Sequence, residues 1–300
     1  MRMEGTDSRF SQRHPFIFGV LMIIMAVVLI LGATAFFRSM GISDGIRMFG
    51  KDKIGVVHIE GMILDSTDIV DWIRTLKNDE SVKGILLRVN SPGGSIAPSQ
   101  EIYQAVKALN DIKPVVASYG TVAASGGYYA SVPAQVIVAN PGSITASIGV
   151  MAEFVTVTQA MEKLGIKPEV LTTGKYKAAG TPMRDLSPEQ REQLLGLMQD
   201  LHEQFVADVA SARQMNPERV AAIADGRAVS GRQALALGLI DMLGSQEQAF
   251  AKLKELCGIT EKAALLEGPV EERTFIQEIL GSFKIDLSSS LPTGWTFSYK

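Results

Sequence analysis

Short apolar runs alternate with amphipathic segments along the middle of the chain. Strand-like runs occur at 54–59, 84–89, 114–118, 135–139 and 168–171. Helical patterns lie between some of them, at 69–77, 99–109 and 156–164. Alternation of strands with helices is typical of βαβ units. The pattern therefore predicts an α/β fold with a largely parallel sheet.

A long amphipathic helix is expected after this region. Ser187 is suited to cap its N-terminus, and Pro188 is suited to its first position. One face of this helix carries the apolar residues Leu194, Leu197, Met198, Leu201, Phe205 and Val209. Such a stripe more often packs into a core than binds a ligand.

The N-terminal region contains an apolar run without charge, over residues 15–37. This run is long enough to span a bilayer. A cleaved secretory signal is the alternative, because Ala33-Thr34-Ala35 resembles a cleavage site. The apolar core of such a signal is usually shorter, about 7–15 residues. We therefore expect an uncleaved transmembrane anchor.

The charges that flank this run are nearly balanced. Arg9 and Arg13 precede it closely, and Arg38 follows it. A large domain can cross a membrane regardless of charge. We expect a cytoplasmic N-terminal tail and a folded domain on the other side.

Composition fits one globular domain on an anchor. The chain has 300 residues, 46% of them hydrophobic, and a net charge of −3. This slightly negative net charge gives no support for nucleic-acid binding, which requires a basic patch or stripe. The single cysteine, Cys257, cannot form an intramolecular disulfide. No Cys/His cluster has the spacing of metal ligands, so we expect neither a metal nor an organic cofactor.

The most informative segment is Ala123-Ala124-Ser125-Gly126-Gly127-Tyr128-Tyr129, which follows an apolar strand. Gly126 and Gly127 leave room for a carbonyl group to approach Ser125. A helix that begins here directs backbone N–H groups at an oxyanion. The alternative is that these small residues only pack a helix against a sheet. The segment favours a serine nucleophile on a strand-to-helix turn.

A second glycine turn, over residues 90–95, follows another apolar strand. In an acyl-transfer enzyme, the N–H group of Gly93 or Gly94 would supply a second oxyanion donor. The turn has neither the Gly-Lys-Ser/Thr of a phosphate loop nor a GxGxxG pattern. Phosphate binding is therefore not expected.

A serine nucleophile needs a base, and no histidine is well placed to supply one. His14 borders the apolar run, His58 lies in a predicted strand, and His202 lies on the polar side of a helix. The remaining candidates are Lys175 and Lys177. Only an uncharged lysine can act as a base, and the small residues after Lys177 favour desolvation of its amine.

The order of five motifs, at 90–95, 123–129, 142–150, 174–184 and 226–231, resembles the signal peptide peptidase A family of membrane-bound Ser-Lys proteases, in its short single-domain form. The resemblance covers about residues 53–256. It implies that Ser125 is the nucleophile and Lys177 the general base. It also implies that Gly94 and Gly126 supply the oxyanion hole and that Ser147 orients the lysine.

The same resemblance implies a Clp-protease/crotonase-like fold and a domain plan. In this plan, 1–14 is a cytoplasmic tail, 15–37 the transmembrane anchor, 38–52 a linker, 53–258 the protease domain and 259–300 a C-terminal extension. The implied location is the bacterial cytoplasmic (inner) membrane, with the protease on the extracytoplasmic or periplasmic side.

The family resemblance also implies partners. The substrates would be signal peptides that remain after secretory processing, and other extended apolar peptides. The chain would form a homo-oligomeric ring in which the serine and lysine of one site come from neighbouring subunits. The C-terminal peptide could occupy the chain's own binding groove.

Two other functions fit parts of the sequence. A crotonase-like acyl-CoA enzyme would also place two oxyanion N–H groups across a cleft, and it predicts activity that survives Ser125→Ala. An inactive scaffold for membrane complexes predicts no reactive serine. The anchor and the Lys177 segment argue against the first, and the intact set of catalytic residue types argues against the second.

Overall fold

The computed structural model describes residues 15–39, 52–269 and 297–299. The chain divides into two compact units, 1–51 and 52–300. The described part of the first unit is helix α2 (Pro15–Ser39). Across the described ranges, no helix combines the length and apolar character needed to cross a membrane. The predicted transmembrane anchor at 15–37 is therefore not shown.

The second unit is built on a parallel sheet. Its strands, in spatial order, are β9 (Ala264–Gly268), β1 (Lys53–Ile63), β2 (Val82–Ser95), β3 (Val115–Ala124), β4 (Val136–Ala139) and β8 (Met242–Leu243). Each neighbouring pair in this order is parallel. The predicted parallel sheet is confirmed, and four of the five expected strands form it.

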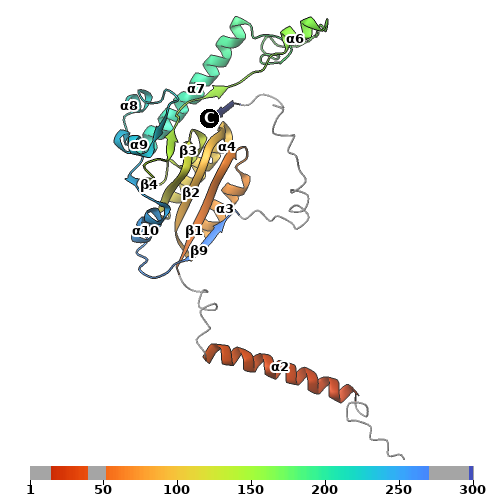
Figure 1. Ribbon diagram of the computed structural model, residues 1–300, viewed down its shortest axis with the longest axis vertical. Helices are drawn as coiled ribbons and strands as arrows, with labels where there is room; N and C mark the ends of the chain where they lie inside the picture. The colour runs from red at the N-terminus through yellow and green to blue at the C-terminus, as the bar shows by residue number, and fades with distance from the viewer. Residues whose placement is uncertain (1–14, 40–51, 270–296, 300) are drawn as a thin grey trace, which may run out of the picture. The chain divides into compact units, whose positions relative to one another are not determined.

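Helices cover both faces of this sheet (Figure 1). Leu86, Val116 and Val138 pack with Leu253 of helix α10 (Gln246–Leu256) on one face. The residues that alternate with them point to the other face, where helices α3 (Thr67–Asn78) and α4 (Ile96–Asn110) complete the main core. Both faces of each central strand are apolar because both are covered.

The sheet branches where β2 and β3 end. β5 (Ile144–Ala146) continues parallel to β3, and β7 (Ala228–Ser230) pairs antiparallel with β5. On the other branch, β10 (Phe297–Tyr299) lies between β2 and β6 (Met151–Ala152) and is antiparallel to both. Both candidate glycine turns lie at this branching end.

Five further helices of the second unit are described. They are α5 (Gly126–Ser131), α6 (Thr158–Lys163), α7 (Pro188–Arg213), α8 (Pro217–Ala221) and α9 (Gly231–Leu237). Helix α7 begins as predicted, because Ser187 and Gln190 form a capping box. Leu194, Phe205 and Val209 are buried, but Leu197 is 37% exposed, so only part of the predicted stripe belongs to the core.

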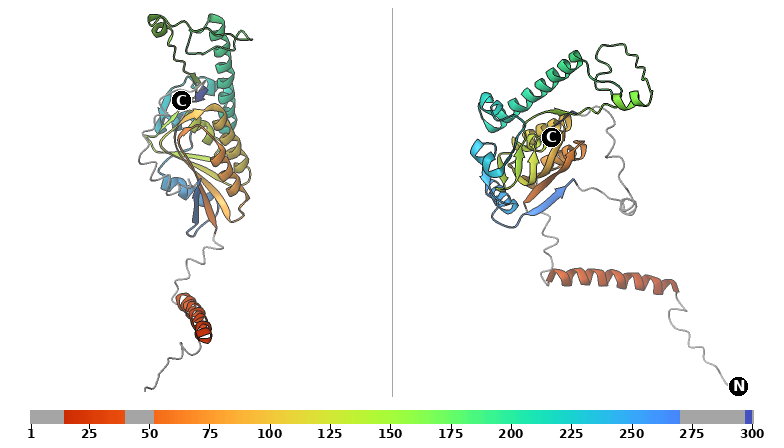
Figure 2. Two further views of the ribbon diagram at one scale, coloured as in Figure 1. Left: turned by 90° about the vertical axis from the view of Figure 1, so that its right-hand side faces the viewer. Right: turned by 45° about the horizontal axis from the view of Figure 1, so that its top comes forward.

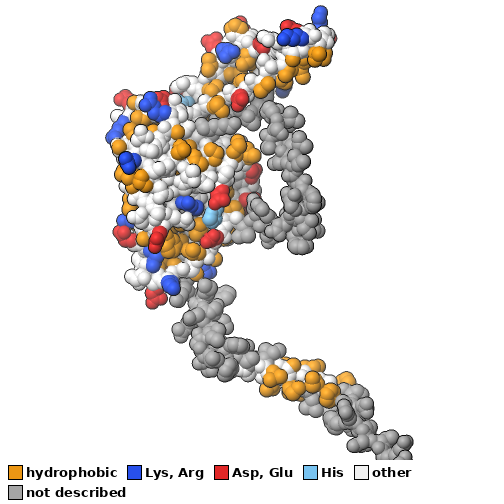
Figure 3. Space-filling view, viewed as in Figure 1, with side chains coloured by type: hydrophobic (Ala, Val, Ile, Leu, Met, Phe, Trp, Pro, Cys, Tyr) orange, Lys and Arg blue, Asp and Glu red, His pale blue; other side chains and the backbone are white. Residues whose placement is uncertain are grey.

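Residues 153–187, here called the arm, project from the sheet together with the start of α7 (Figure 2). The strand expected at 168–171 does not form, and residues 164–187 of the arm contain neither helix nor strand. The expected helix at 156–164 is present as α6. Large apolar residues are exposed along the arm: Val155, Val157, Leu164, Ile166, Val170, Leu171, Tyr176 and Met183. Figure 3 shows hydrophobic side chains on the surface of this projection.

Candidate active site

Ser125 lies on a sharp turn between β3 and α5. Its backbone has φ 53° and ψ −119°, a left-handed conformation that a non-glycine residue rarely adopts. The Ser125 N–H donates to the Ala146 carbonyl at 2.7 Å, and the Tyr129 N–H donates to the Ser125 carbonyl at 2.8 Å. Strain of this kind costs about 1–3 kcal/mol and persists where the surroundings enforce it, often at active sites.

The second glycine turn lies directly against the N-terminus of α5. A Cβ atom on Gly126 would lie 3.2 Å from the Gly94 nitrogen and 3.2 Å from the Gly93 Cα atom. Gly94 itself has no room for a side chain, because a Cβ there would overlap the backbone of Ile63. The structure thus brings Gly94 and Gly126 together, beside Ser125. The first N–H groups of a helix have no partner within that helix and can bind an anion.

The Ser125 hydroxyl is buried and, in the described part of the chain, has no hydrogen-bond partner. Lys177 lies in the arm with its side chain exposed, immediately before the buried residues Ala178 and Ala179. A single copy of the chain therefore does not bring the Lys177 amine within hydrogen-bond distance of Ser125.

Ser147 lies one residue after Ala146, whose carbonyl holds the Ser125 N–H. It is buried and has φ 52°. Its N–H donates to the Arg227 carbonyl at 3.1 Å, and its hydroxyl donates to the Gly226 carbonyl at 3.2 Å. Ser147 is thus fixed close to the nucleophile turn, while its action on a lysine stays a prediction.

Neither described histidine bonds to the nucleophile. His58 lies between Glu60 and Glu267, 3.5 Å from a carboxylate oxygen of each. A ring nitrogen of His202 lies 2.8 Å from the Ala224 carbonyl oxygen. His14 lies outside the described residues. The described histidines thus have other partners, and the argument against a Ser-His-Asp triad stays a prediction.

Buried hydroxyl groups of Tyr119, Tyr128 and Ser131 form hydrogen bonds at α5 that were not predicted from the sequence. Tyr128 donates to the Leu239 carbonyl at 2.9 Å, and Ser131 donates to the Gly127 carbonyl at 2.7 Å. The Tyr119 and Ser131 hydroxyls are 3.0 Å apart. Burial raises the pKa of both Tyr119 and Tyr128, so both side chains stay neutral phenols. The only sequence signal for this support was the Tyr128-Tyr129 pair after the glycines.

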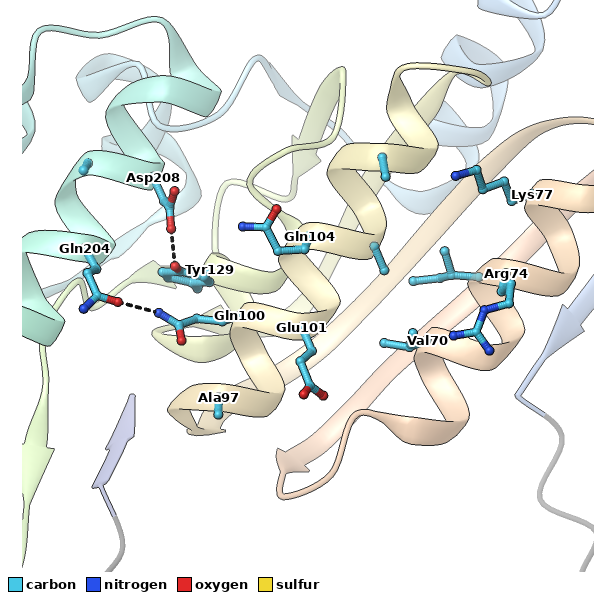
Figure 4. Close-up of a pocket in the computed structure, with 14 residues that line it drawn as sticks. Val70, Arg74, Lys77, Ala97, Gln100, Glu101, Gln104, Tyr129, Gln204 and Asp208 are labelled. Atoms are coloured by element: carbon cyan, nitrogen blue, oxygen red, sulfur yellow. Dashed lines mark hydrogen bonds between the residues drawn. The ribbon is translucent and has the colours of Figure 1, made fainter.

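A cavity of about 1110 Å³ lies between α3, α4 and α7, on the face of the sheet that α3 and α4 cover. Its lining includes Tyr129 of α5, which donates a hydrogen bond to Asp208 of α7 (Figure 4). Ser125 and Lys177 do not line it. This cavity therefore lies behind the nucleophile helix and is not the site of the predicted chemistry.

The C-terminal strand β10 occupies the space between β2 and β6. Tyr299 pairs with Gly94, and Ser298 pairs with Ser95 on one side and with Met151 on the other. A short extended peptide thus pairs with a strand on each side, next to a candidate oxyanion donor. This arrangement is β-strand addition, a common mode of peptide recognition.

Within the ranges that the structure describes, no group of three or more His, Cys, Asp or Glu side chains could hold a metal ion. The described site consists of a serine on a strained turn, with Gly94 and Gly126 close to one another beside it.

Comparison with known proteins identifies the family of this chain. The model of peptidase family S49 matches residues 107–260, and the Clp protease model matches residues 52–148. This chain belongs to peptidase family S49. The second match assigns a Clp-protease-like fold to the parallel-sheet half of the domain.

Relatives with high coverage bear names of proteases. A protein named as a protease in Synechocystis sp. is 36% identical over 233 residues, which are 77% of this chain and 84% of that protein. One in Methanocaldococcus jannaschii is 32% identical over 273 residues, which are 86% and 88% of the two chains. A protein named as a signal peptide peptidase SppA in Enterococcus faecium is 33% identical over 211 residues, or 70% and 61%. These names favour a peptidase over an acyl-CoA enzyme.

Proposed function

We propose that this chain is a membrane-anchored serine endopeptidase with a Ser125–Lys177 dyad, which hydrolyses signal peptides left after secretory processing and other extended apolar peptides. One observation carries the proposal: Ser125 lies on a strained strand-to-helix turn beside Gly94 and Gly126. Membership of a peptidase family supports the same chemistry.

The reaction follows from the chemistry of these groups. A neutral Lys177 amine takes the proton of Ser125 as its oxygen attacks the peptide carbonyl. The N–H groups of Gly94 and Gly126 stabilise the oxyanion. The lysine ammonium then protonates the leaving amine, and water hydrolyses the acyl-enzyme. No cofactor takes part in these steps.

The proposal requires a second copy of the chain, because Ser125 has no base in a single described copy. The arm supports this requirement: it carries Lys177 and a row of exposed apolar side chains that a neighbouring subunit could cover. Docking of the arm on a neighbour would also remove water from the lysine amine. We therefore propose a homo-oligomeric ring with dyads shared between subunits.

The proposed substrate is an extended, apolar peptide. Its backbone would take the place of β10, between β2 and β6. Met151 of β6 pairs with Ser298 of β10 and is 40% exposed, and Met62 of β1, which pairs with Gly93 of β2, is 50% exposed. Apolar substrate side chains would cover them and gain the free energy of burial.

Membrane attachment is supported by the uncharged apolar run at 15–37. Together with the family resemblance, it gives the proposed location at the bacterial cytoplasmic membrane, with the protease domain on the extracytoplasmic side. An alkaline carbonate wash tests attachment: the full chain should stay in the membrane fraction, and release by the wash would contradict the anchor.

Hydrolysis of a fluorogenic apolar peptide by the full chain in detergent tests the dyad. We expect Ser125→Ala and Lys177→Ala each to be inactive, because the first removes the nucleophile and the second removes the proposed base. Lys175→Ala is the matched control and should stay active. A Lys177→Ala variant that still cleaves would show that the base is another residue.

Mixing the two inactive variants tests the shared site. Subunits with intact Lys177 can then meet subunits with intact Ser125, so part of the activity should return. A fully assembled mixture that is as inactive as each parent would refute sharing between subunits. It would not refute the dyad, which the two single variants test.

A further inference from the structure

The glycine turn that faces Ser125 contains a buried hydroxyl group with no role so far. Ser91 is fully buried, and its Oγ atom accepts a hydrogen bond from the Gly93 N–H at 3.1 Å. A serine that bonds the N–H two residues later fixes the backbone of a turn. Ser91 thus restrains the Pro92–Gly93 peptide unit, which directly precedes the unit that carries the Gly94 N–H.

The same residue also contacts the nucleophile turn. A Cβ atom on Gly127 would lie 2.6 Å from the Ser91 carbonyl oxygen and 3.1 Å from the Ser91 Cβ atom. Ser91 is also paired in register with Ala123, two residues before the nucleophile. Ser91 therefore belongs to one turn and packs against the other.

The turn needs such a restraint. Gly93 has φ +107°, a conformation open to glycine, and glycine has more backbone freedom than any other residue. Rotation at Gly93 redirects the N–H of Gly94. An oxyanion donor must lie within a narrow distance of the developing charge, and a displacement of about 1 Å can cost 100-fold in rate.

We propose that Ser91 is a positioning residue: its hydroxyl fixes Gly93 so that the Gly94 N–H points at the carbonyl attacked by Ser125. This inference rests on the proposed function. It predicts an effect on the transition state, where the oxyanion forms, and little effect on binding of the peptide ground state.

The test compares the full-length wild type with Ser91→Ala, Ser143→Ala and Ser125→Ala on a fluorogenic apolar peptide. Ser143 is the matched control, because it is 2% exposed and its Oγ donates to the Gly120 carbonyl at 2.6 Å. A peptide aldehyde serves as the transition-state probe, since its hemiacetal with serine places an oxygen in the oxyanion hole. Thermal unfolding is recorded for each variant.

For Ser91→Ala we expect kcat to fall about 10- to 100-fold, with KM within about twofold and with weaker aldehyde inhibition in parallel. Ser143→Ala should show a comparable loss of thermal stability with kcat near the wild-type value. If Ser91→Ala does not fold, Ser91→Cys replaces it, because a thiol has nearly the same shape but is a weak acceptor.

An unchanged kcat in folded Ser91→Ala, or a loss confined to KM, overturns the inference. The inference is also overturned if Ser143→Ala lowers kcat as much as Ser91→Ala does, because both losses would then reflect general destabilisation. In all these cases an inactive Ser125→Ala leaves the proposed function standing. An active Ser125→Ala refutes the proposed function itself.

Discussion

Substitution of Gly126 by alanine tests how closely the two glycine turns must approach. The added Cβ would lie 2.5 Å from the Ser99 hydroxyl oxygen and 3.2 Å from both Gly94 N and Gly93 Cα. Ser99 is fully buried, and its hydroxyl donates to the Ser95 carbonyl at 2.8 Å, so it has little freedom to move away. Ordinary contact between such atoms needs about 3.5 Å. Gly126 must therefore move about 1 Å away from Ser99 of helix α4, and a few tenths of an ångström away from the turn that contains Gly93 and Gly94.

The cost of this separation has two parts. Overpacking of a dense core costs about 1–3 kcal/mol, which in a domain of this size lowers Tm by about 2–4 °C per kcal/mol. A displacement of about 1 Å at an oxyanion donor lowers kcat about 100-fold. We therefore expect Gly126→Ala to unfold at lower temperature and to lose most of its peptidase activity.

The assay pairs thermal unfolding with steady-state kinetics on a fluorogenic peptide. Gly196→Ala is the control, because no atom lies within 4 Å of a Cβ there and alanine is favoured over glycine inside helix α7. It should be slightly more stable than wild type and fully active. Ser99→Ala removes the closest contact, so combining it with Gly126→Ala should recover part of the lost activity. Wild-type kcat in Gly126→Ala would refute the reasoning.

Three further predictions follow from other contacts. Deletion of residues 297–300 removes β10 from its place beside Gly94; steady-state kinetics should show a lower apparent KM with kcat unchanged, and a higher KM would contradict competition by the tail. Ser147→Ala should lower kcat about tenfold through poorer orientation of the base, and a wild-type pH–rate profile with unchanged kcat would show that Ser147 does not act on the lysine. Arg213→Ala breaks a bidentate pair with Asp241, with bonds of 2.6 and 3.1 Å. It should destabilise the domain by about 3 kcal/mol in urea unfolding, because Asp241 is left partly buried without its partner. An unchanged midpoint would mean that the pair contributes nothing.

The parallel core could be predicted because its signals are local. Apolar runs of five or six residues mark β1 to β4, and Ser187-Pro188 marks the start of α7. The turn at Ser125 was also readable, because small residues after an apolar strand leave few other conformations. In each case the residues that determine the structure are neighbours in the sequence.

The elements that were not predicted depend on pairing between residues far apart in the sequence. Strands β5 to β8 have two or three residues each, too few for a local signal. β5 pairs with β3, β8 with β4, β7 with β5 and β6 with β10. The apolar residues at 168–171 resemble a strand but form none. The pairing of β10 with β2 joins residues about 200 positions apart, which no local pattern encodes.

The pairing of β1 with β9 has a consequence for synthesis of the protein. Lys53 of β1 pairs with Ala264 of β9. At ribosomal rates of about 5–20 residues per second, roughly 200 residues take about 10–40 s to emerge. During this time the outer edge of β1 has no partner and exposes a row of unpaired N–H and C=O groups, which can pair with another nascent chain. A ribosome that stalls before residue 264 therefore releases an aggregation-prone fragment, even though most of the domain has already been made.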